Sequence, residues 1–232
     1  MTGTLYGVGV GPGDPELMTL RAHRLISGAA VVAYPAPDSG ESFARAIAAG
    51  AIPEGAREIP IVVPMRVARF PAQEVYDRAA AEIGAELAAG QDVVVLCEGD
   101  PFFYGSFMYL FARLAGTHRC EIVPGVSSLG AVTAAAQSPL VAREEVLVVV
   151  PATLPAEELE TRIAAADAVA VMKLGRHFEK AREVIARLGL TGRAVFVRHA
   201  SLPQEGVCPL AEAPDDAPYF SMILIPGRDA HV

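Results

Sequence analysis

Five short segments of the sequence bring glycine or hydroxyl groups together with side chains that can bind a ligand. They are Gly7–Gly13, Cys97–Ser106, Pro124–Ser128, Lys173–Gly175 and Arg198–Ser201. Each segment follows or overlaps a short apolar run that is typical of a β-strand. Ligands of parallel α/β sheets bind beyond the carboxyl ends of the strands. This placement therefore predicts a small-molecule site built from loops at strand ends.

The first segment, GVGVGPG, is the richest in glycine. Glycine lets the backbone approach a ligand closely and adopt positive φ. The spacing is not the GxGxxG of a dinucleotide loop, and Pro12 interrupts the turn. Ala33 stands near the position where such a loop needs a ribose-binding acid. A nicotinamide cofactor is therefore disfavoured, and the segment is either a ligand loop or a tight strand-to-helix turn.

The second segment, CEGDPFFYGS, follows the apolar run Val93–Leu96. Gly99 allows a close approach of the backbone, and Pro101 stiffens the turn. Glu98 and Asp100 add carboxylates that accept hydrogen bonds or face a cation. An alternative interpretation makes Asp100 the N-cap of a helix that begins at Pro101, and this is compatible with ligand binding.

The remaining segments carry hydroxyl, amine and imidazole groups. Ser127 and Ser128 stand at an expected helix start, where hydroxyls either cap the helix or bind a ligand. Lys173 and His199 each follow a predicted strand. Among the side chains near it, only His199 titrates near pH 7, although a single histidine is often structural. The other four histidines lack the spacing of metal ligands, so no metal is expected.

Other catalytic motifs and binding classes find little support. No Ser/His/Asp order, P-loop lysine or paired-carboxylate motif stands out. The 232 residues carry a formal charge of −8, which argues against broad nucleic-acid binding. Cys97, Cys120 and Cys208 form no CxxC pair, which suits a reducing compartment.

A membrane location is also disfavoured. The first residues lack a basic region followed by an apolar run, so we expect no signal peptide. The uncharged stretch 122–142 contains Pro124, Gly125 and Pro139, which favours a strand, loop and helix over a membrane span. We expect a cytoplasmic protein.

Short β-branched runs alternate with longer alanine-rich stretches along the chain. Strands are predicted at Leu5–Val10, Ala29–Ala33, Ile59–Val63, Val93–Leu96, Glu121–Val123, Val146–Val150, Ala168–Met172, Arg193–Arg198 and Tyr219–Ile225. Helices are predicted at Phe43–Ala49, Pro71–Gly90, Phe103–Leu114, Ala156–Ala165 and Arg176–Leu188. One further helix is predicted to begin at Asp14, and another is predicted to follow Pro124 and Gly125 and to end at Ala136. The segment Pro203–Pro218 is expected to form a loop or an edge hairpin.

This alternation predicts an α/β fold with mostly parallel strands. The 52% of hydrophobic residues is enough for a large core. A brief rise in polarity around Gly116–Arg119 predicts a boundary between two α/β domains, residues 1–117 and 118–232, with a small ligand between them.

Three motifs together resemble those of the tetrapyrrole (corrin and porphyrin) methylases. They are GVGVGPGDPELMTLRA, CEGDPFFYGSFMYL and VPGVSS. The second motif is similar to that of one branch of the family in its double Phe, Tyr104 and Phe107–Tyr109. That branch methylates C20 of precorrin-2, giving precorrin-3A in cobalamin biosynthesis. The resemblance runs through nearly the whole chain. It implies two α/β domains with a cleft between them, a homodimer, and S-adenosylmethionine as methyl donor with S-adenosylhomocysteine as product.

The resemblance also implies site residues. It puts the tetrapyrrole on the N-terminal side of the cleft and S-adenosylmethionine on the C-terminal side. The implied cofactor-binding residues are Pro12, Gly99, Asp100, Tyr104, Ser127, Ser128, Lys173, Leu174, His199, Ala200, Met222 and Ile223. A multiply anionic substrate needs a local positive patch in an acidic protein. The expected substrate-binding residues are Arg66, Arg69, Arg176 and Arg198, alongside Lys173. For each, a solvated surface charge is the alternative.

The implied chemistry is transfer of a methyl group from a sulfonium to an electron-rich carbon. Such a step needs alignment, which supplies roughly 7–11 kcal/mol. Loss of the C20 proton afterwards calls for a base, with Glu98, Asp100, Tyr104 and His199 as candidates.

Four alternatives stay open. They are a cobalt-precorrin-2 C20-methyltransferase of the anaerobic route, a methylase of another acceptor such as rRNA or diphthine, a non-catalytic S-adenosylmethionine-binding relative, and a dehydrogenase. The charge of −8 weakens the rRNA version, and the missing ribose acid weakens the dehydrogenase.

Overall fold

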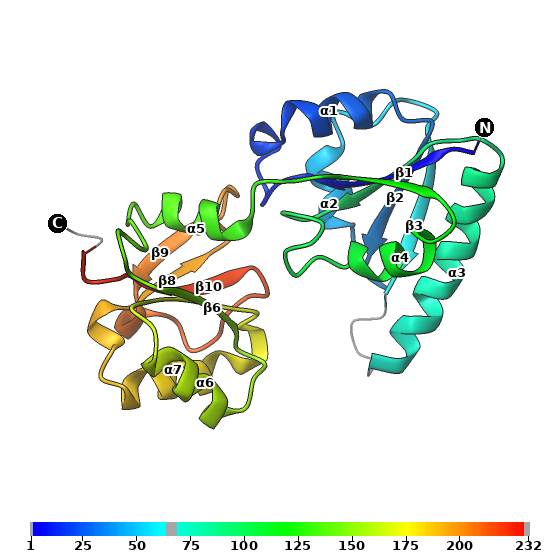
Figure 1. Ribbon diagram of the computed structural model, residues 1–232. Coiled ribbons are helices and arrows are strands. Elements are labelled where there is room, and N and C mark those ends of the chain that lie inside the picture. Colours follow the sequence, from blue (N-terminus) through cyan, green and yellow to red (C-terminus); the bar gives the residue numbers. More distant parts are fainter. Residues whose placement is uncertain (1, 64–68, 230–232) are drawn as a thin grey trace. The chain divides into compact units, whose positions relative to one another are not determined.

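A computed structural model describes residues 2–63 and 69–229 of the chain (Figure 1). It divides into two compact units, Met1–Ser127 and Ser128–Val232. Each unit holds a five-stranded sheet. Arg66, one of the expected substrate-binding residues, lies outside the described residues, and for Arg69 only the backbone position is described.

The first unit is a parallel sheet in the order β3-β2-β4-β1-β5. Its strands are β1 (Thr4–Gly9), β2 (Val31–Ala36), β3 (Arg57–Val62), β4 (Val93–Cys97) and β5 (Arg119–Val123). Its helices are η1 (Pro15–Leu17), α1 (Leu20–Ser27), α2 (Phe43–Ala48), α3 (Arg69–Ala88) and α4 (Phe107–Leu114). The register places Gly9 beside Cys97, so β1 and β4 end at the same edge.

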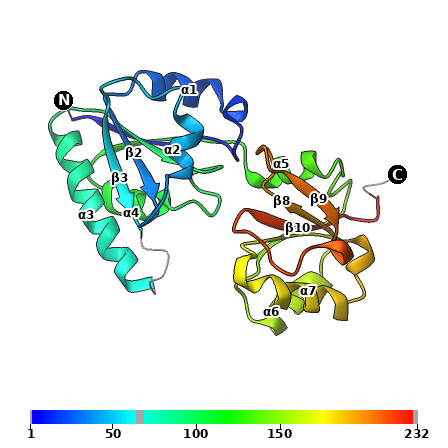
Figure 2. The same cartoon turned by 180° about the vertical axis from the view of Figure 1, so that it is seen from behind.

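Helices cover both faces of this sheet. One face packs Val8, Val32 and Leu96 in a core with residues of α1 and α2. The other packs Leu5 and Val95 in a core with residues of α3 and α4. Figures 1 and 2 show α1 and α4 on opposite sides of the sheet. Because both faces are covered, β4 reads as the unbroken apolar run VVVLC, and all five of its residues are buried.

The second unit combines parallel and antiparallel strands in the order β6-β7-β10-β8-β9. Its strands are β6 (Leu147–Pro151), β7 (Ala168–Met172), β8 (Val195–Arg198), β9 (Gly206–Pro209) and β10 (Ser221–Ile225). Its helices are α5 (Ser128–Ala135), α6 (Ala156–Ala164), η2 (Gly175–His177), α7 (Phe178–Arg187), η3 (Thr191–Arg193) and η4 (Leu210–Glu212). β6 and β7 are parallel, whereas β10 runs antiparallel to both β7 and β8.

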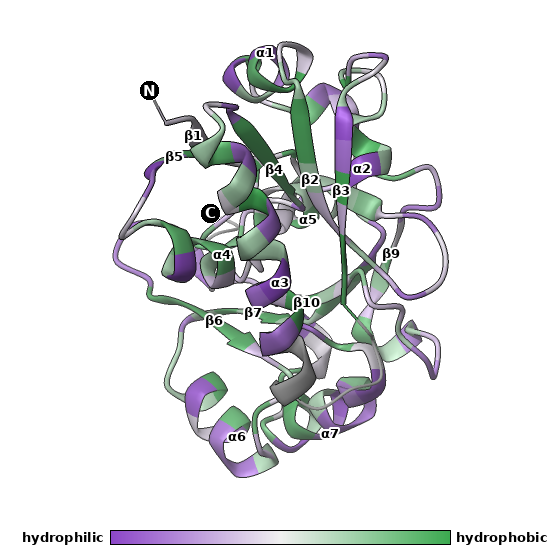
Figure 3. Ribbon diagram, turned by 90° about the vertical axis from the view of Figure 1, so that its right-hand side faces the viewer, coloured by the Kyte–Doolittle hydropathy of each residue, from purple (hydrophilic) through white to green (hydrophobic). Residues whose placement is uncertain are grey.

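The second sheet is also covered on both faces. Residues of α6 and α7 pack with Val171, Phe196 and Ile223. Val132 of α5 packs with Val197 on the other face. Figure 3 shows the resulting contrast between apolar strands and helices that carry polar residues. Within the described residues, no helix is both long enough and apolar enough to cross a membrane.

The predicted α/β class is confirmed. Five of the eight strand pairings in the described residues are parallel. The segment Pro203–Pro218, expected to form a loop or an edge hairpin, contributes the edge strand β9, which pairs with the preceding β8.

Three predicted boundaries were wrong. The division falls after Ser127 and not after residue 117, since β5 pairs with β1 in the first sheet. α4 begins at Phe107, because the residues from Pro101 to Ser106 form a turn. Asp14 caps only the short helix η1, and the longer α1 begins after Thr19, whose hydroxyl accepts the Ala22 N–H.

A charged contact ties α2 to the edge of the first sheet. The Arg45 guanidinium donates to both carboxylate oxygens of Glu58 on β3, at 2.6 and 2.8 Å. This hydrogen-bonded partner lowers the pKa of the Glu58 carboxyl below its ordinary value. Burial and the neighbouring Glu58 raise the pKa of Tyr34 on β2. Glu58 thus joins three elements of the first unit.

Replacing Glu58 with Gln should make the protein less stable at neutral pH by about 0.2–1 kcal/mol. The folded-state pKa of Glu58 is lowered, so its stabilisation is present above about pH 4.5 and is lost as pH falls through the folded value. Denaturant unfolding from pH 7 to pH 3 should show the two proteins converging at acid pH. Arg45→Gln should remove the same pH dependence, and a gap that widens at low pH would contradict this account.

Candidate functional site

The carboxyl ends of β1 and β4 are joined through their backbones. Val10 N–H donates to the Cys97 carbonyl at 2.9 Å, and Gly99 N–H donates to the Gly11 carbonyl at 2.8 Å. Gly11 and Gly99 have φ of +88° and +61°, a region that favours glycine. The two glycine-containing segments predicted from the sequence therefore lie side by side.

A third loop closes on the same point. A Cβ placed on Gly125 would lie 2.0 Å from the Gly99 carbonyl oxygen, and one on Gly9 would lie 2.7 Å from the Gly125 Cα. No real side chain tolerates such distances. These glycines are needed because three loops touch backbone to backbone, which supports the tight-turn interpretation of the first segment. The contact also leaves their peptide groups at the edge where ligands of such sheets bind.

Asp100 holds two of these loops together. Its Oδ1 accepts the N–H groups of Phe102 and Phe103 at 2.9 and 3.1 Å. Its Oδ2 accepts the Gly125 N–H at 3.1 Å. The carboxylate caps its own turn, and not a helix beginning at Pro101 as the alternative expected, and it also reaches the loop after β5. We infer that Asp100 acts chiefly by positioning this part of the site.

The turn after Asp100 has a strained shape. Tyr104 has a φ of +58°, which is unusual for an aromatic residue. A Cβ on the following Gly105 would lie 2.6 Å from the Pro101 carbonyl oxygen. Such strain persists only where the surroundings hold it, and it is common at functional sites. The Tyr104 side chain is 41% exposed.

Glu98 is a half-buried acid of this edge. Burial raises the pKa of its carboxyl, while hydrogen bonds from its own backbone N–H and from that of Ala44 lower it in part. The carboxyl therefore faces the start of α2. The sequence marked Glu98 only by its position after a strand, and nothing in it revealed the contact with Ala44.

The second unit has a comparable edge. β7 and β8 run in the same direction, and β10 lies between them in the opposite sense, so the amino end of β10 meets their carboxyl ends. Lys173 and His199 directly follow β7 and β8, with φ of +57° and +50°. The His199 N–H donates to the Phe220 carbonyl at 2.8 Å. The structure thus brings these two predicted residues to one edge.

His199 carries an unsatisfied buried atom. Its Nδ1 is buried and has no hydrogen-bond partner in the part of the chain that the structure describes. A buried polar atom without a partner is costly and calls for an explanation such as a ligand. By contrast, the residues Leu174, Met222 and Ile223 are at most 3% exposed and lie in the cores. The structure therefore leaves these three predicted residues covered at this edge.

The other predicted positions are spread over both units. Pro12 lies in the loop between β1 and η1, Ser127 precedes α5, and Ser128 is its first residue. Ala200 follows His199 in the turn after β8. Arg176 and Arg198 are both exposed.

One surface pocket of the second unit contains none of the predicted residues. It measures about 510 Å³ and is lined by residues of α5 and of the segment between Gln137 and Leu147. It lies away from the strand ends that carry Lys173 and His199.

A match to a family model decides the family. Residues 4–214 match the model of the Tetrapyrrole (Corrin/Porphyrin) Methylases. The chain belongs to the tetrapyrrole methylase family. The match spans both sheets, except the last strand, so the strand-end loops described above are those of a tetrapyrrole methylase.

Several curated tetrapyrrole methylases resemble this one over almost its whole length. The Precorrin-2 C(20)-methyltransferase of Sinorhizobium sp is 38% identical, with 97% of this chain and 96% of that protein covered. The Cobalt-precorrin-2 C(20)-methyltransferase of Salmonella typhimurium is 32% identical, with 97% of each covered. The Cobalamin biosynthesis protein CobIJ of Mycobacterium bovis is 44% identical over 97% of this chain. The chain spans only 46% of that longer relative.

Solved structures agree on the fold. The cobalt precorrin-4 methyltransferase CbiF superposes with a TM-score of 0.76 at 24% identity, covering 96% of this chain and 94% of that one. A uroporphyrin-III C-methyl transferase from Thermus thermophilus, solved with S-adenosylhomocysteine, gives 0.68 at 27% identity, covering 96% and 97%. The predicted family and fold are confirmed.

Gly125→Ala should destabilise the protein by more than about 2 kcal/mol, because the new Cβ would meet the Gly99 carbonyl oxygen at 2.0 Å. Gly130→Ala in α5 is the matched control, since its Cβ meets nothing within 4 Å. Alanine favours helix, so the control should stabilise by about 0.5–1 kcal/mol. Urea unfolding of the three proteins measures both signs. Equal stability of Gly125→Ala and the wild type would refute the close contact.

Asp100→Ala should lower stability by about 1–3 kcal/mol, because three backbone N–H groups lose their acceptor. Asp100→Asn keeps one acceptor oxygen and should lose less. Hydrogen exchange at Phe102, Phe103 and Gly125 should speed up in the alanine variant. Unchanged exchange at Gly125 would show that the carboxylate does not join the two loops.

Proposed function

We propose that the chain is an S-adenosylmethionine-dependent methyltransferase that methylates C20 of precorrin-2 to give precorrin-3A in cobalamin biosynthesis. One observation carries the proposal. The loop CEGDPFFYGS is joined to VPGVSS through Asp100 and Gly125, in a chain 38% identical to a named precorrin-2 C20-methyltransferase. Agreement over 97% of this chain and 96% of that relative supports a shared activity.

The strand-end residues fit the proposed cofactor. An adenosine needs hydrogen-bond partners for its ring and ribose, and the edge of the second unit offers peptide groups together with the unsatisfied Nδ1 of His199. The cofactor-binding set is Pro12, Gly99, Asp100, Tyr104, Ser127, Ser128, Lys173, Leu174, His199, Ala200, Met222 and Ile223. Within this set, Leu174, Met222 and Ile223 are buried beneath the edge, and Asp100 acts by shaping its loop.

When bound, S-adenosylmethionine supplies a methyl group on a positively charged sulfur. The residues of this chain provide alignment, since rigid backbone contacts at strand ends hold their groups in place before the substrates arrive. We assign the tetrapyrrole to the first unit and the cofactor chiefly to the second, as the family resemblance implies. Arg176 and Arg198 are exposed and available for carboxylates at the substrate rim.

Four side chains are candidates for the base that removes the C20 proton: Glu98, Asp100, Tyr104 and His199. Asp100 already accepts three backbone hydrogen bonds. Burial raises the pKa of the Glu98 carboxyl, which makes its carboxylate a stronger base. We therefore keep Glu98, Tyr104 and His199 as candidates and place Asp100 behind them.

A second candidate function is the same methylation of cobalt-precorrin-2. The relative from Salmonella typhimurium, named for that substrate, is 32% identical over 97% of this chain. The relative named for precorrin-2 is more similar, at 38% identity, and this favours precorrin-2 as the substrate. We also propose that the protein is a homodimer, as the family resemblance implies, and that it is cytoplasmic, as its cysteine pattern suggests.

Calorimetric titration with S-adenosylhomocysteine, and with NAD in parallel, tests the cofactor. Micromolar binding of S-adenosylhomocysteine alone is expected, and His199→Ala should weaken it about tenfold because the ligand loses a partner at Nδ1. Leu20→Ser, at a position 89% exposed on α1, is the control and should bind normally. Binding of NAD alone would replace the methyltransferase with a dehydrogenase.

An activity assay under anaerobic conditions distinguishes the remaining hypotheses about function. The protein is incubated with methyl-labelled S-adenosylmethionine and either metal-free or cobalt-loaded precorrin-2, and the labelled carbon is located by NMR. Label at C20 of metal-free substrate supports the proposal, and label only on cobalt-loaded substrate supports the second candidate. Cofactor binding without transfer to either would identify a non-catalytic relative.

A further inference from the structure

The turn between β4 and α4 is anchored at its first end and strained in its middle. Asp100 anchors the first end through two backbone hydrogen bonds. Tyr104 has a φ of +58°, and the following Gly105 has no room for a Cβ. Strain of this kind persists only where the surrounding structure holds the segment. The second end of the turn, at Ser106, therefore needs a support of its own.

That support comes from Tyr76 on α3. Ser106 directly precedes α4, where a serine hydroxyl commonly caps the helix, but here the hydroxyl makes no capping hydrogen bond. It donates instead to the hydroxyl oxygen of Tyr76. Burial raises the pKa of Tyr76, and this hydrogen bond lowers it in part. Because Tyr76 is only 6% exposed, its hydroxyl is fixed in place by the packing around its ring.

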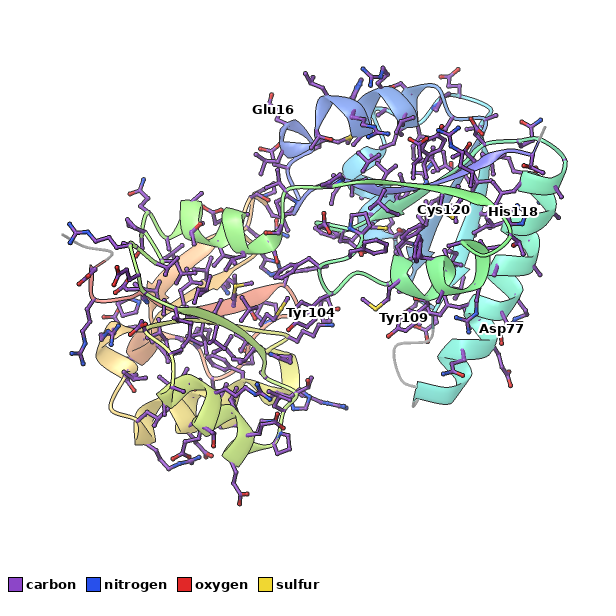
Figure 4. All side chains as sticks on the ribbon, in the orientation of Figure 1. Glu16, Asp77, Tyr104, Tyr109, His118 and Cys120 are labelled. Atoms are coloured by element: carbon purple, nitrogen blue, oxygen red, sulfur yellow. The ribbon has the colours of Figure 1, made fainter. Side chains whose placement is uncertain are left out.

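Tyr76 also contacts the first turn of α4 through its ring. The ring lies 4.9 Å from that of Tyr109, whose N–H donates to the Ser106 carbonyl at 3.1 Å. Figure 4 shows Tyr109 on α4, and Asp77, the next residue after Tyr76, on α3. One buried side chain of α3 thus holds the start of α4 at two points.

A second connection between these helices lies farther along α4. The Arg113 guanidinium donates to the Asp77 carboxylate at 2.6 Å and to the Gln73 carbonyl at 3.3 Å. The Asp77 side chain is 64% exposed, so water competes for this ion pair. Arg113 holds the body of α4, whereas Tyr76 holds the end at which the turn meets the helix.

We propose that Tyr76 is a positioning residue for methyl transfer, which acts through Ser106 to fix the turn that carries Tyr104. This rests on the proposed function, because the turn must belong to the site of the reaction. A small misplacement of groups at such a site costs rate, since the reacting atoms need close alignment. Loss of the hydrogen bond should therefore slow the reaction more than it weakens binding.

The test is a double-mutant cycle on methyl transfer to precorrin-2. Tyr76→Phe removes only the hydroxyl and should lower kcat about tenfold, while the KM for S-adenosylmethionine changes by less than about twofold. Ser106→Ala should cause a similar loss. The double variant should lose no more than either single variant, because all three lack the same hydrogen bond. Ser106→Thr keeps a hydroxyl and should retain the wild-type kcat.

Tyr34→Phe is the matched control. Tyr34 is also a buried tyrosine, 8% exposed, with its hydroxyl bonded to Glu58, but it packs on the other face of the first sheet. This variant should keep the wild-type kcat. Hydrogen exchange adds a measurement that needs no substrate. Exchange of the Tyr109 N–H should be faster in Tyr76→Phe and unchanged in Tyr34→Phe.

The outcomes separate this inference from the proposed function. A wild-type kcat in Tyr76→Phe, or additive losses in the double variant, would overturn the positioning role and leave the methyltransferase intact. An equal loss of kcat in Tyr34→Phe would show a general effect of removing a buried hydroxyl and would also overturn it. A wild-type protein that methylates neither precorrin-2 nor its cobalt form would overturn the proposed function and, with it, the role in methyl transfer. Faster exchange at Tyr109 would then still show that Tyr76 holds the start of α4.

Discussion

The site of the first unit depends on the direct contact of three backbone loops at the end of a parallel sheet. Gly9 and Gly125 lie so close to the Gly99 carbonyl oxygen that a side chain on either would collide with it. Asp100 holds this contact by accepting N–H groups from its own turn and from the loop after β5. The glycines remove side chains from the edge, and the carboxylate replaces the hydrogen bonds that the loops would otherwise lack. Both are needed for peptide groups to stand rigidly at this edge.

The corresponding edge of the second unit has a different backbone conformation. There Lys173 and His199 take positive φ without being glycine. Such conformations cost of order 1–3 kcal/mol each and persist only where the surrounding structure determines them. The buried strands beneath them, with Val171, Val197 and Ile223 fully covered, provide that support. Strain at the edge is thus offset by packing in the cores, and the unsatisfied Nδ1 of His199 lies at this strained point.

These features suit a reaction that needs alignment more than a strong acid or base. The half-buried acid Glu98 has a raised pKa and faces α2. Asp100 is engaged with the backbone. The first unit also carries exposed aromatic side chains in the turn after β4 and in α4, such as Tyr104 and Tyr109, beside these peptide groups. A methyl transfer between two bound organic molecules is favoured by such an arrangement, because correct placement lowers the barrier without proton transfer in the same step.

Local pattern was enough to predict much of this molecule. The buried run Val93–Cys97, the helix that ends before Gly90, and the loops that follow each strand can be read from periodicity and turn residues. Only the tertiary structure decided that β5 joins the first sheet, that β10 runs antiparallel between β7 and β8, and that Asp100 reaches Gly125. Strand pairing and loop contact join residues far apart in the chain. Local periodicity and turn chemistry report each residue's immediate neighbours, so they carry no record of which distant segment will meet it.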